Sequence, residues 1–353
     1  MFTRFLMVAI FALSQTKLAG AQSTTPNTYR LFVGYEQGTM VGVFDIQNGR
    51  VVAMNSIPMG GKAYGISINN GVVRIACADN NDQGDVDAFD VLSLQRLGST
   101  KIANVAEKGS PFGIAITKNG KRMFVTDKID HVVYDCNLVD GTTSIIPVKL
   151  GRWAEWAIKF CLLSADENFL FVTGSQEGGL LYRINLLTGE TDTIQGMSGA
   201  RGMAIIGDNL YVTNETPYAP GVTVVDIPSF KVVKVIKLNP QFGGAFTLDI
   251  NEDKSLVYTL QGFGFPLALN AQSGELVAQG ELDSSTYYYG ITCFGDWVAV
   301  ASQAPRGARP NSVKIFSRDL NNPEKLILTD VISGYSTGPY LMAVTKLPPP
   351  EQQ

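Results

Sequence analysis

The chain has little of what most catalytic chemistry uses. Its 353 residues include one histidine, His131, and four cysteines without the paired spacing of a metal site. Phosphate-loop, dinucleotide-binding and haem-attachment motifs are missing. Charged residues make up only 17%, and the formal net charge is −4, which disfavours a nucleic-acid partner. We therefore expect no cofactor, no bound metal and no nucleic acid.

Long hydrophobic runs are also lacking, apart from one near the N-terminus. Arg4 precedes an apolar run over residues 5–13, and the small residues 19–21 follow, a pattern typical of a secretory signal peptide over residues 1–21. This run is too short for a membrane anchor. Removing it takes away two basic residues and no acidic one, so the formal charge becomes −6. We expect a protein that is secreted or retained in the secretory-pathway lumen.

Three further features belong to this exported chain. The cysteines Cys77, Cys136, Cys161 and Cys293 fall on apolar strands of repeat units that are mostly not adjacent, which favours free thiols over disulfides. Asn214 begins the sequence Asn-Glu-Thr, an acceptor for N-glycosylation in a eukaryotic secretory pathway. The acidic segment 79–87 spaces oxygen atoms like a calcium loop, but no closing glutamate follows, and a solvated loop is favoured.

What is present is a repeat. Seven compact β-prone runs recur along the chain, each bounded by turn residues, at residues 30–34, 73–77, 123–126, 169–173, 210–213, 256–259 and 297–300. A shorter run with small residues precedes each run except the first, at residues 65–68, 113–116, 157–160, 202–205, 246–249 and 290–293. The missing partner stands at the other end, as Tyr340 to Val344. This displacement predicts a ring of blades that the C-terminal strand closes.

The predicted fold is therefore an all-β, seven-bladed β-propeller over residues 29–346, preceded by a flexible lead-in (22–28) and followed by a proline-rich tail (347–353). Asn48-Gly49, Asp140-Gly141, Thr188-Gly189 and Ser273-Gly274 mark tight turns between third and fourth strands. Asp45, Asp90, Asp135 and Asp226 recur just before such turns, where capping of the turn is favoured over catalysis.

One segment carries a family resemblance. Tyr-Val-Thr-Asn at 211–214, continued by Val-Thr-Val-Val-Asp at 222–226 and Lys-Val-Val-Lys-Val-Ile at 231–236, resembles the YVTN-type seven-bladed β-propeller family. Echoes of this motif cover the whole chain after residue 21. The resemblance implies a fold and little more, since such propellers include surface-layer proteins, lactonase-like enzymes and binding proteins.

Aromatic residues gather at one predicted mouth of the ring. The positions that enter the innermost strands are Tyr64, Phe112, Trp156, Arg201, Ala245, Tyr289 and Tyr340. Neighbouring segments add Trp153, Phe242, Tyr287, Phe263 and Phe265. These rings either plug a tapering channel or form a cage for a hydrophobic small molecule. We expect Tyr64, Phe112, Trp153, Trp156, Phe242, Tyr287, Phe263 and Phe265 to bind substrate.

Polar groups among these rings are few, so the catalytic candidates are Arg201, Tyr289 and Tyr340. Arg201 is the one cation at an entering position, where it could donate to a carbonyl or carboxylate or pair with a loop acid. His131 lies in a loop near the same mouth, without the Gly-x-Ser-x-Gly sequence of a serine hydrolase.

Three functions fit this inventory. A cofactor-independent enzyme would hold a hydrophobic metabolite and promote its cyclisation or cycloaddition chiefly by positioning. An exported propeller with an aromatic mouth resembles the fungal biosynthetic hetero-Diels–Alderases of tropolone sesquiterpenoid pathways, which implies coupling of a quinone-methide-like diene to a terpene alkene. The alternatives are a non-catalytic extracellular binding or adhesion propeller and a lactonase-like hydrolase. The oligomeric state is not predicted.

Overall fold

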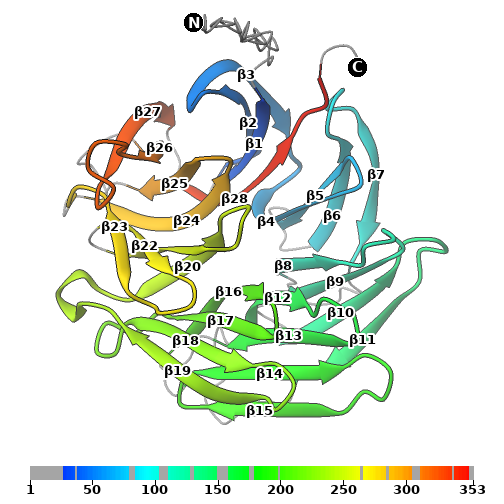
Figure 1. Ribbon diagram of the computed structural model, residues 1–353. Coiled ribbons are helices and arrows are strands. Elements are labelled where there is room, and N and C mark those ends of the chain that lie inside the picture. Colours follow the sequence, from blue (N-terminus) through cyan, green and yellow to red (C-terminus); the bar gives the residue numbers. More distant parts are fainter. Residues whose placement is uncertain are drawn as a thin grey trace, which may run out of the picture.

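The computed structural model describes residues 27–35, 38–78, 84–102, 110–127, 131–148, 158–174, 179–197, 199–262, 265–283, 286–303, 311–335 and 338–349. They form seven four-stranded antiparallel sheets arranged as blades around one axis (Figure 1). The seven-bladed β-propeller predicted from the repeat is confirmed. The predicted signal peptide lies outside the described residues.

The strands run from the axis outwards in each blade. Blade 1 contains β28 (Pro339–Lys346), β1 (Thr28–Tyr35), β2 (Met40–Gln47) and β3 (Arg50–Pro58); blade 2 contains β4 (Lys62–Asn69), β5 (Val72–Ala78), β6 (Gly84–Asp90) and β7 (Arg96–Lys101). Blade 3 contains β8 (Pro111–Ile116), β9 (Arg122–Asp127), β10 (Val132–Asn137) and β11 (Thr143–Pro147); blade 4 contains β12 (Ile158–Leu163), β13 (Phe169–Gly174), β14 (Leu180–Asn185) and β15 (Thr191–Gln195).

Blade 5 contains β16 (Ala200–Ile206), β17 (Asn209–Asn214), β18 (Gly221–Asp226) and β19 (Lys231–Lys237), and the short 3-10 helix η1 (Pro240–Phe242) follows it. Blade 6 contains β20 (Ala245–Ile250), β21 (Leu256–Gln261), β22 (Pro266–Asn270) and β23 (Leu276–Gln279). Blade 7 contains β24 (Tyr287–Phe294), β25 (Trp297–Gln303), β26 (Asn311–Arg318) and β27 (Leu326–Tyr335).

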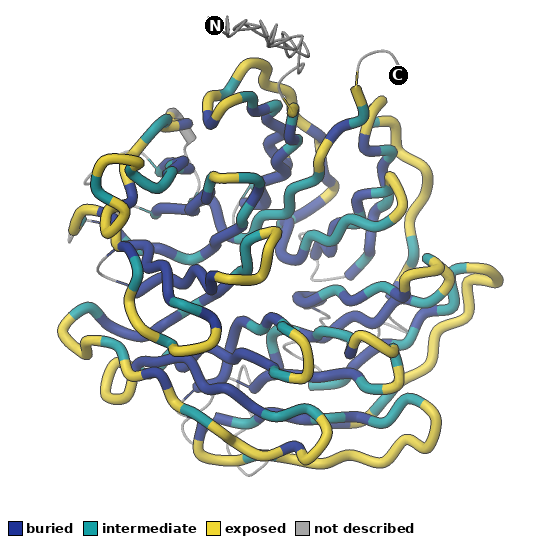
Figure 2. The backbone as a smooth tube through the Cα atoms, viewed as in Figure 1, coloured by how far each residue is buried: buried dark blue, intermediate teal, exposed yellow. Residues whose placement is uncertain are grey.

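The ring closes through the pairing of the chain's two ends. The C-terminal strand β28 lies antiparallel to β1, with Tyr29 opposite Lys346 and Val33 opposite Met342 (Figure 1). Buried residues occupy the strands and exposed ones the turns and outer strands (Figure 2). Closure by a strand from the other end of the chain removes the open edges that a linear array of sheets would leave.

Glycines in the inner strands let neighbouring blades approach closely at the axis. A Cβ on Gly113 would lie 2.7 Å from the carbonyl oxygen of Lys159 in the next blade, and one on Gly202 would lie 2.8 Å from the Cα of Thr247. Real Cβ atoms do not tolerate such distances. The Gly-Ile-Ala and Gly-Ile-Ser runs of the repeat are therefore contact points between blades.

The threonine that ends the repeat's Val-Thr runs joins blades by hydrogen bonds. The Thr213 hydroxyl accepts from the Gly202 backbone N–H (2.8 Å) and donates to the Phe246 carbonyl of blade 6 (3.0 Å). Each inner strand has a register irregularity near its first residue, such as that between Ala200 and Met203, which leaves this N–H outside the ladder. The hydroxyl satisfies a buried group on each of two blades.

The turns confirm most, and correct part, of the prediction. Gly49, Gly141, Gly189 and Gly274 all have positive φ, as tight turns require. Asp90 and Asp226 cap turns by accepting from Ser93 and Ser229. The prediction was wrong for Asp45 and Asp135, which instead form ion pairs with Arg30 and Arg122. An arginine on the adjacent strand attracts the carboxylate away from the turn.

Candidate functional site

The strand register defines which seven residues enter the channel. In each inner strand, the residue that follows the last paired position before the register irregularity is, in blade order, Tyr340, Tyr64, Phe112, Lys159, Arg201, Phe246 and Tyr289. We call these residues the entrance ring. The sequence assignment was therefore wrong in two blades, where Lys159 replaces Trp156 and Phe246 replaces Ala245. Blades 4 and 6 have Phe160 and Thr247 in place of the glycine that follows this position in blades 2, 3, 5 and 7, which obscured the register in both.

The aromatic members of the entrance ring meet at the axis. The Phe112 ring centroid lies 5.8 Å from that of Tyr64, 5.8 Å from that of Tyr340 and 5.3 Å from that of Phe160. Tyr289 lies 5.3 Å from Tyr340. These residues come from the consecutive blades 7, 1, 2, 3 and 4, and three of the four contacts join neighbouring blades, while the Phe112–Tyr340 contact skips blade 2. The described rings therefore pack against one another at this end of the channel.

Arg201 is the polar centre of the entrance ring. It is only 3% exposed. Its Nη2 donates to the Tyr340 hydroxyl at 2.6 Å, its Nη1 pairs with Glu215, and its Cζ lies 4.7 Å from the Phe246 ring centroid. Its buried Nε–H makes no hydrogen bond to the described residues. One N–H donor of a charged group is therefore unpaired at a site that is almost inaccessible to water.

The surroundings keep Arg201 charged. Burial alone would lower its pKa, but the nearby Tyr340, Glu215 and Tyr289 outweigh that effect and raise the pKa. The three catalytic candidates, Arg201, Tyr289 and Tyr340, are therefore brought together as expected. The alternative reading of Arg201, an ion pair with a loop acid, also holds, with Glu215 as the acid.

Glu215 holds two cations of the entrance ring. Its Oε2 lies 3.3 Å from the Lys159 ammonium, and its Oε1 pairs with Arg201. The backbone fixes its place, because the Glu215 N–H donates to the Gly199 carbonyl at 2.8 Å and any Cβ on Gly244 would overlap the Glu215 carbonyl. Sequence reasoning missed both Lys159 and Glu215. The position of Glu215 directly after the Tyr-Val-Thr-Asn motif was the available signal.

Below the entrance ring the axis holds a narrow channel of about 230 Å³, lined by inner-strand residues of all seven blades. Asp249 lies there and accepts hydrogen bonds from the Cys293 N–H (2.8 Å) and the Thr292 hydroxyl (3.1 Å). Burial is the main cause that raises its pKa. The channel is too small for a drug-sized ligand, so a substrate of that size would have to meet the ring from outside.

The other predicted binding residues divide into three groups. Tyr287 stacks on Tyr289 at 6.3 Å and so borders the entrance ring. Phe242 and Phe265 contact each other at 5.0 Å, and Phe265 lines a separate groove of about 1,210 Å³ between blades 6 and 7. Trp153, Trp156 and Phe263 lie outside the described residues.

The glycosylation candidate Asn214, the single histidine and the four cysteines remain to be placed. Asn214 is 4% exposed and accepts a hydrogen bond from the Thr223 hydroxyl, a burial that disfavours a glycan there. His131 begins a turn, where its N–H donates to the Asp127 carbonyl. The four cysteines are free thiols, as expected.

Neither a metal site nor a membrane-spanning helix is found among the described residues. Within the described ranges, no group of three or more His, Cys, Asp or Glu side chains is placed to hold a metal ion. The same ranges contain no helix of the length and hydrophobicity that crossing a membrane takes.

The blades and their central channel define a seven-bladed β-propeller, and comparisons with known proteins support that class. No family model matches the chain, and no curated protein matches it. Among solved structures it is similar to Kuenenia stuttgartiensis hydrazine synthase, with a TM-score of 0.61 and 15% identity over 76% of this chain and 86% of that one.

Two further structures are similar at the same level. The dihydro-heme d1 dehydrogenase NirN has a TM-score of 0.60 and 12% identity, covering 89% of this chain and 74% of that one. The Cps50 (Swd1) β-propeller domain of Myceliophteria thermophila has a TM-score of 0.62 and 10% identity, covering 81% and 90%. At these identities the likeness extends to the fold alone.

Proposed function

We propose that this propeller binds a hydrophobic small molecule bearing a carbonyl, enolate or carboxylate oxygen against the entrance ring, and promotes its cyclisation or cycloaddition. The observation that carries the proposal is the buried Arg201 with its unpaired Nε–H. A buried donor without a partner costs about 1–3 kcal/mol, more when charged. A ligand oxygen would supply the missing acceptor.

Tyr340 would supply a second hydrogen-bond donor beside Arg201. Its hydroxyl oxygen accepts from the Arg201 guanidinium, which makes the phenol a stronger donor towards a substrate oxygen. Polarisation of a carbonyl lowers the energy of the unoccupied orbital on the attached π system, and preorganised donors do this without reorganisation cost. The flanking rings of Tyr289 and Phe246 offer flat surfaces on which a conjugated substrate can stack.

Cycloaddition suits this inventory better than hydrolysis. A hetero-Diels–Alder reaction converts π bonds of a diene and an alkene into two new σ bonds, with no leaving group and no obligatory proton transfer. The site then has only to hold two partners together and polarise one, and positioning alone can contribute roughly 7–11 kcal/mol. In line with the family resemblance, we propose a quinone-methide-like diene and a terpene alkene, joined in or beyond the secretory pathway during secondary-metabolite biosynthesis.

The test is product formation from an ortho-quinone methide generated in situ and a sesquiterpene alkene. The uncatalysed reaction gives a racemate, so enantiomeric excess and initial rate both report catalysis. We expect Arg201→Met to lower the rate by about 10²-fold, the range seen when one preorganised donor is removed. Tyr340→Phe should lower it by a smaller factor.

The control is Tyr218→Phe, because Tyr218 is 94% exposed. It should keep the rate and the enantiomeric excess. Binding of both probes without any rate increase would identify a non-catalytic binding propeller instead. Unchanged product formation in a folded Arg201→Met variant would refute the assigned role.

A further inference from the structure

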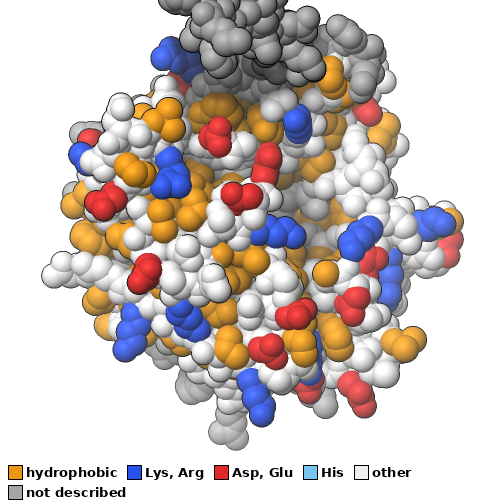
Figure 3. Space-filling view, in the orientation of Figure 1, with side chains coloured by type: hydrophobic (Ala, Val, Ile, Leu, Met, Phe, Trp, Pro, Cys, Tyr) orange, Lys and Arg blue, Asp and Glu red, His pale blue; other side chains and the backbone are white. Residues whose placement is uncertain are grey.

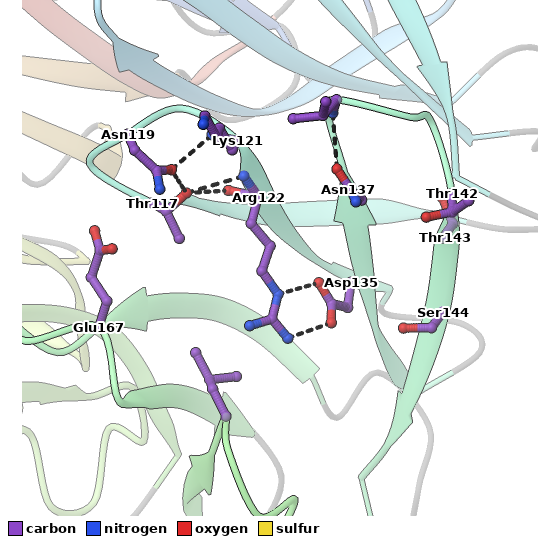
Figure 4. A pocket seen from close by; sticks show the side chains of 12 residues that line it. Thr117, Asn119, Lys121, Arg122, Asp135, Asn137, Thr142, Thr143, Ser144 and Glu167 are labelled. Atoms are coloured by element: carbon purple, nitrogen blue, oxygen red, sulfur yellow. Dashed lines mark hydrogen bonds and ion pairs between the residues drawn. The ribbon is translucent and has the colours of Figure 1, made fainter.

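A second cavity lies at the seam of blades 3 and 4, at the end of the ring opposite the entrance ring. It has a volume of about 650 Å³. Ten of its twelve lining residues are polar or charged, and they come from turns and strands of the two blades (Figure 4), including Thr117, Asn119, Arg122, Asn137, Ser144 and Glu167. None of these residues takes part in the function proposed above.

Arg122 is held rigidly at the centre of this cavity's wall. Its Nε and Nη2 form two parallel bonds to Asp135, at 2.7 and 2.6 Å, and its Cζ lies 4.7 Å from the Phe124 ring centroid. Its Nη1 makes no hydrogen bond to any residue that the structure describes. Figure 4 shows the guanidinium in the space between Asp135 and Glu167. The fixed fork leaves one edge of the guanidinium available.

Blade 1 shows what normally fills that edge. Arg30 also forms two bonds to an aspartate, to Asp45 at 2.6 and 2.7 Å, although Asp45 lies directly opposite Arg30 whereas Asp135 lies diagonally from Arg122. Its Nη1 donates to two consecutive carbonyls of blade 2, those of Val91 (2.6 Å) and Leu92 (2.9 Å). At the seam of blades 3 and 4 Arg122 makes no such bond to the described residues, and its guanidinium borders the cavity. The Arg30 contacts show that the Nη1 of an arginine fixed by a carboxylate can donate to two neighbouring acceptor oxygens.

The lining selects a neutral ligand over an ion. The lining contains two basic residues, Lys121 and Arg122, and two acidic ones, Asp135 and Glu167, so the wall has no excess of either sign. Figure 3 shows basic and acidic side chains interspersed over the visible face, which gives no single-sign field there.

Other groups of the lining are suited to hydroxyl groups. The Asn119 Nδ2 and the Ser144 hydroxyl make no hydrogen bond to the described residues. Leu186 and Val139, which is 72% exposed, add small apolar surfaces. We propose that this cavity binds a neutral saccharide, with two adjacent hydroxyl oxygens on the Arg122 Nη1 edge and a C–H face on Val139 and Leu186.

The proposal is tested by titrating the full chain with cellobiose, maltose and N,N′-diacetylchitobiose, followed by saturation-transfer NMR and calorimetry, with inorganic sulfate as the anionic probe. We expect saturable binding of at least one disaccharide. Arg122→Lys, which keeps the charge but loses the fork, should weaken it tenfold or more. Ser144→Trp should abolish it by filling the cavity, since Ser144 lies opposite Asp135 in the cavity wall.

The matched control is Ser99→Trp, which places the same ring on the exposed outer strand of blade 2 and should bind like the wild type. Thermal unfolding checks that each variant folds. Lack of saturable binding by the wild type, wild-type affinity in the Arg122→Lys or the Ser144→Trp variant, or binding of sulfate in preference to the disaccharides would each overturn the proposal. Tyr340→Phe should leave this binding intact, which separates it from the function of the entrance ring.

Discussion

Removal of one hydroxyl group, in Tyr340→Phe, should destabilise the whole ring. The lost bond joins Tyr340 of blade 1 to Arg201 of blade 5 across the axis. Arg201 is 3% exposed, so water cannot replace the bond, and the guanidinium would be left with unpaired donors at both Nη2 and Nε. Loss of a hydrogen bond to a charged group costs about 1.5–3 kcal/mol.

Urea unfolding followed by tryptophan fluorescence measures this loss. With a denaturant slope of roughly 3 kcal/mol/M, a loss of about 2 kcal/mol lowers the midpoint by about 0.7 M. A double-mutant cycle with Arg201→Met isolates the bond, and we expect a coupling free energy of roughly 1–2 kcal/mol. Tyr218→Phe removes an exposed hydroxyl and should stay within about 0.5 kcal/mol of the wild type.

The reasoning fails if Tyr340→Phe unfolds at the same urea concentration as Tyr218→Phe, or if the cycle gives no coupling. Either result would mean that Arg201 and Tyr340 do not interact as the geometry indicates. The polarised phenol would then lose its physical basis, and with it the proposed contribution of Tyr340 to catalysis.

Three other outcomes follow from the structure. Thr213→Val should lower the free energy of unfolding by about 2–4 kcal/mol in urea titrations, because it strands the Gly202 N–H and the Phe246 carbonyl, whereas the exposed Thr191→Val should have no effect. Burial raises the pKa of Asp249 above 3.8, so the folded state favours its neutral form and loses stability as pH rises through the raised pKa. As the pH rises from 4 to 7, the melting temperature of the wild type should therefore fall relative to that of Asp249→Asn. A difference between the two melting temperatures that stays constant over this range would contradict the raised pKa of Asp249. Burial also raises the pKa of all four thiols, so Ellman's reagent at pH 8 should count none in the folded chain and four after denaturation.

Much of the fold could be predicted because its signals are local. Alternating β-prone runs, turns with glycine at positive φ and the displaced run at 340–344 each depend on a few neighbouring residues. The site was only partly predictable. Arg201 and Tyr289 were found because a glycine follows each of them, and Tyr340 because it begins the displaced run at 340–344, while blade 4 lacks this glycine and Lys159 was missed.

Two contacts could not be derived from the sequence. Arg201 and Tyr340 lie 139 residues apart and meet only when blades 1 and 5 face each other across the axis. The free Nη1 of Arg122 could not be derived either, since it depends on a diagonal pairing with Asp135 and on what blade 4 presents, whereas the Nη1 of Arg30 donates to two carbonyls of blade 2.

The sequence by itself determined the number of blades, the closure of the ring and the aromatic character of its entrance, because the period of a repeat and the residues at its equivalent positions can be identified along the chain without knowledge of packing. Only the tertiary structure decided which of the described aromatic rings pack against one another near the axis. It also decided that Glu215 pairs with both Lys159 and Arg201, and that the Arg201 Nε–H has no partner among the described residues. These properties depend on irregularities of register and on distances between blades, and both are set by packing around the whole ring rather than by any single repeat.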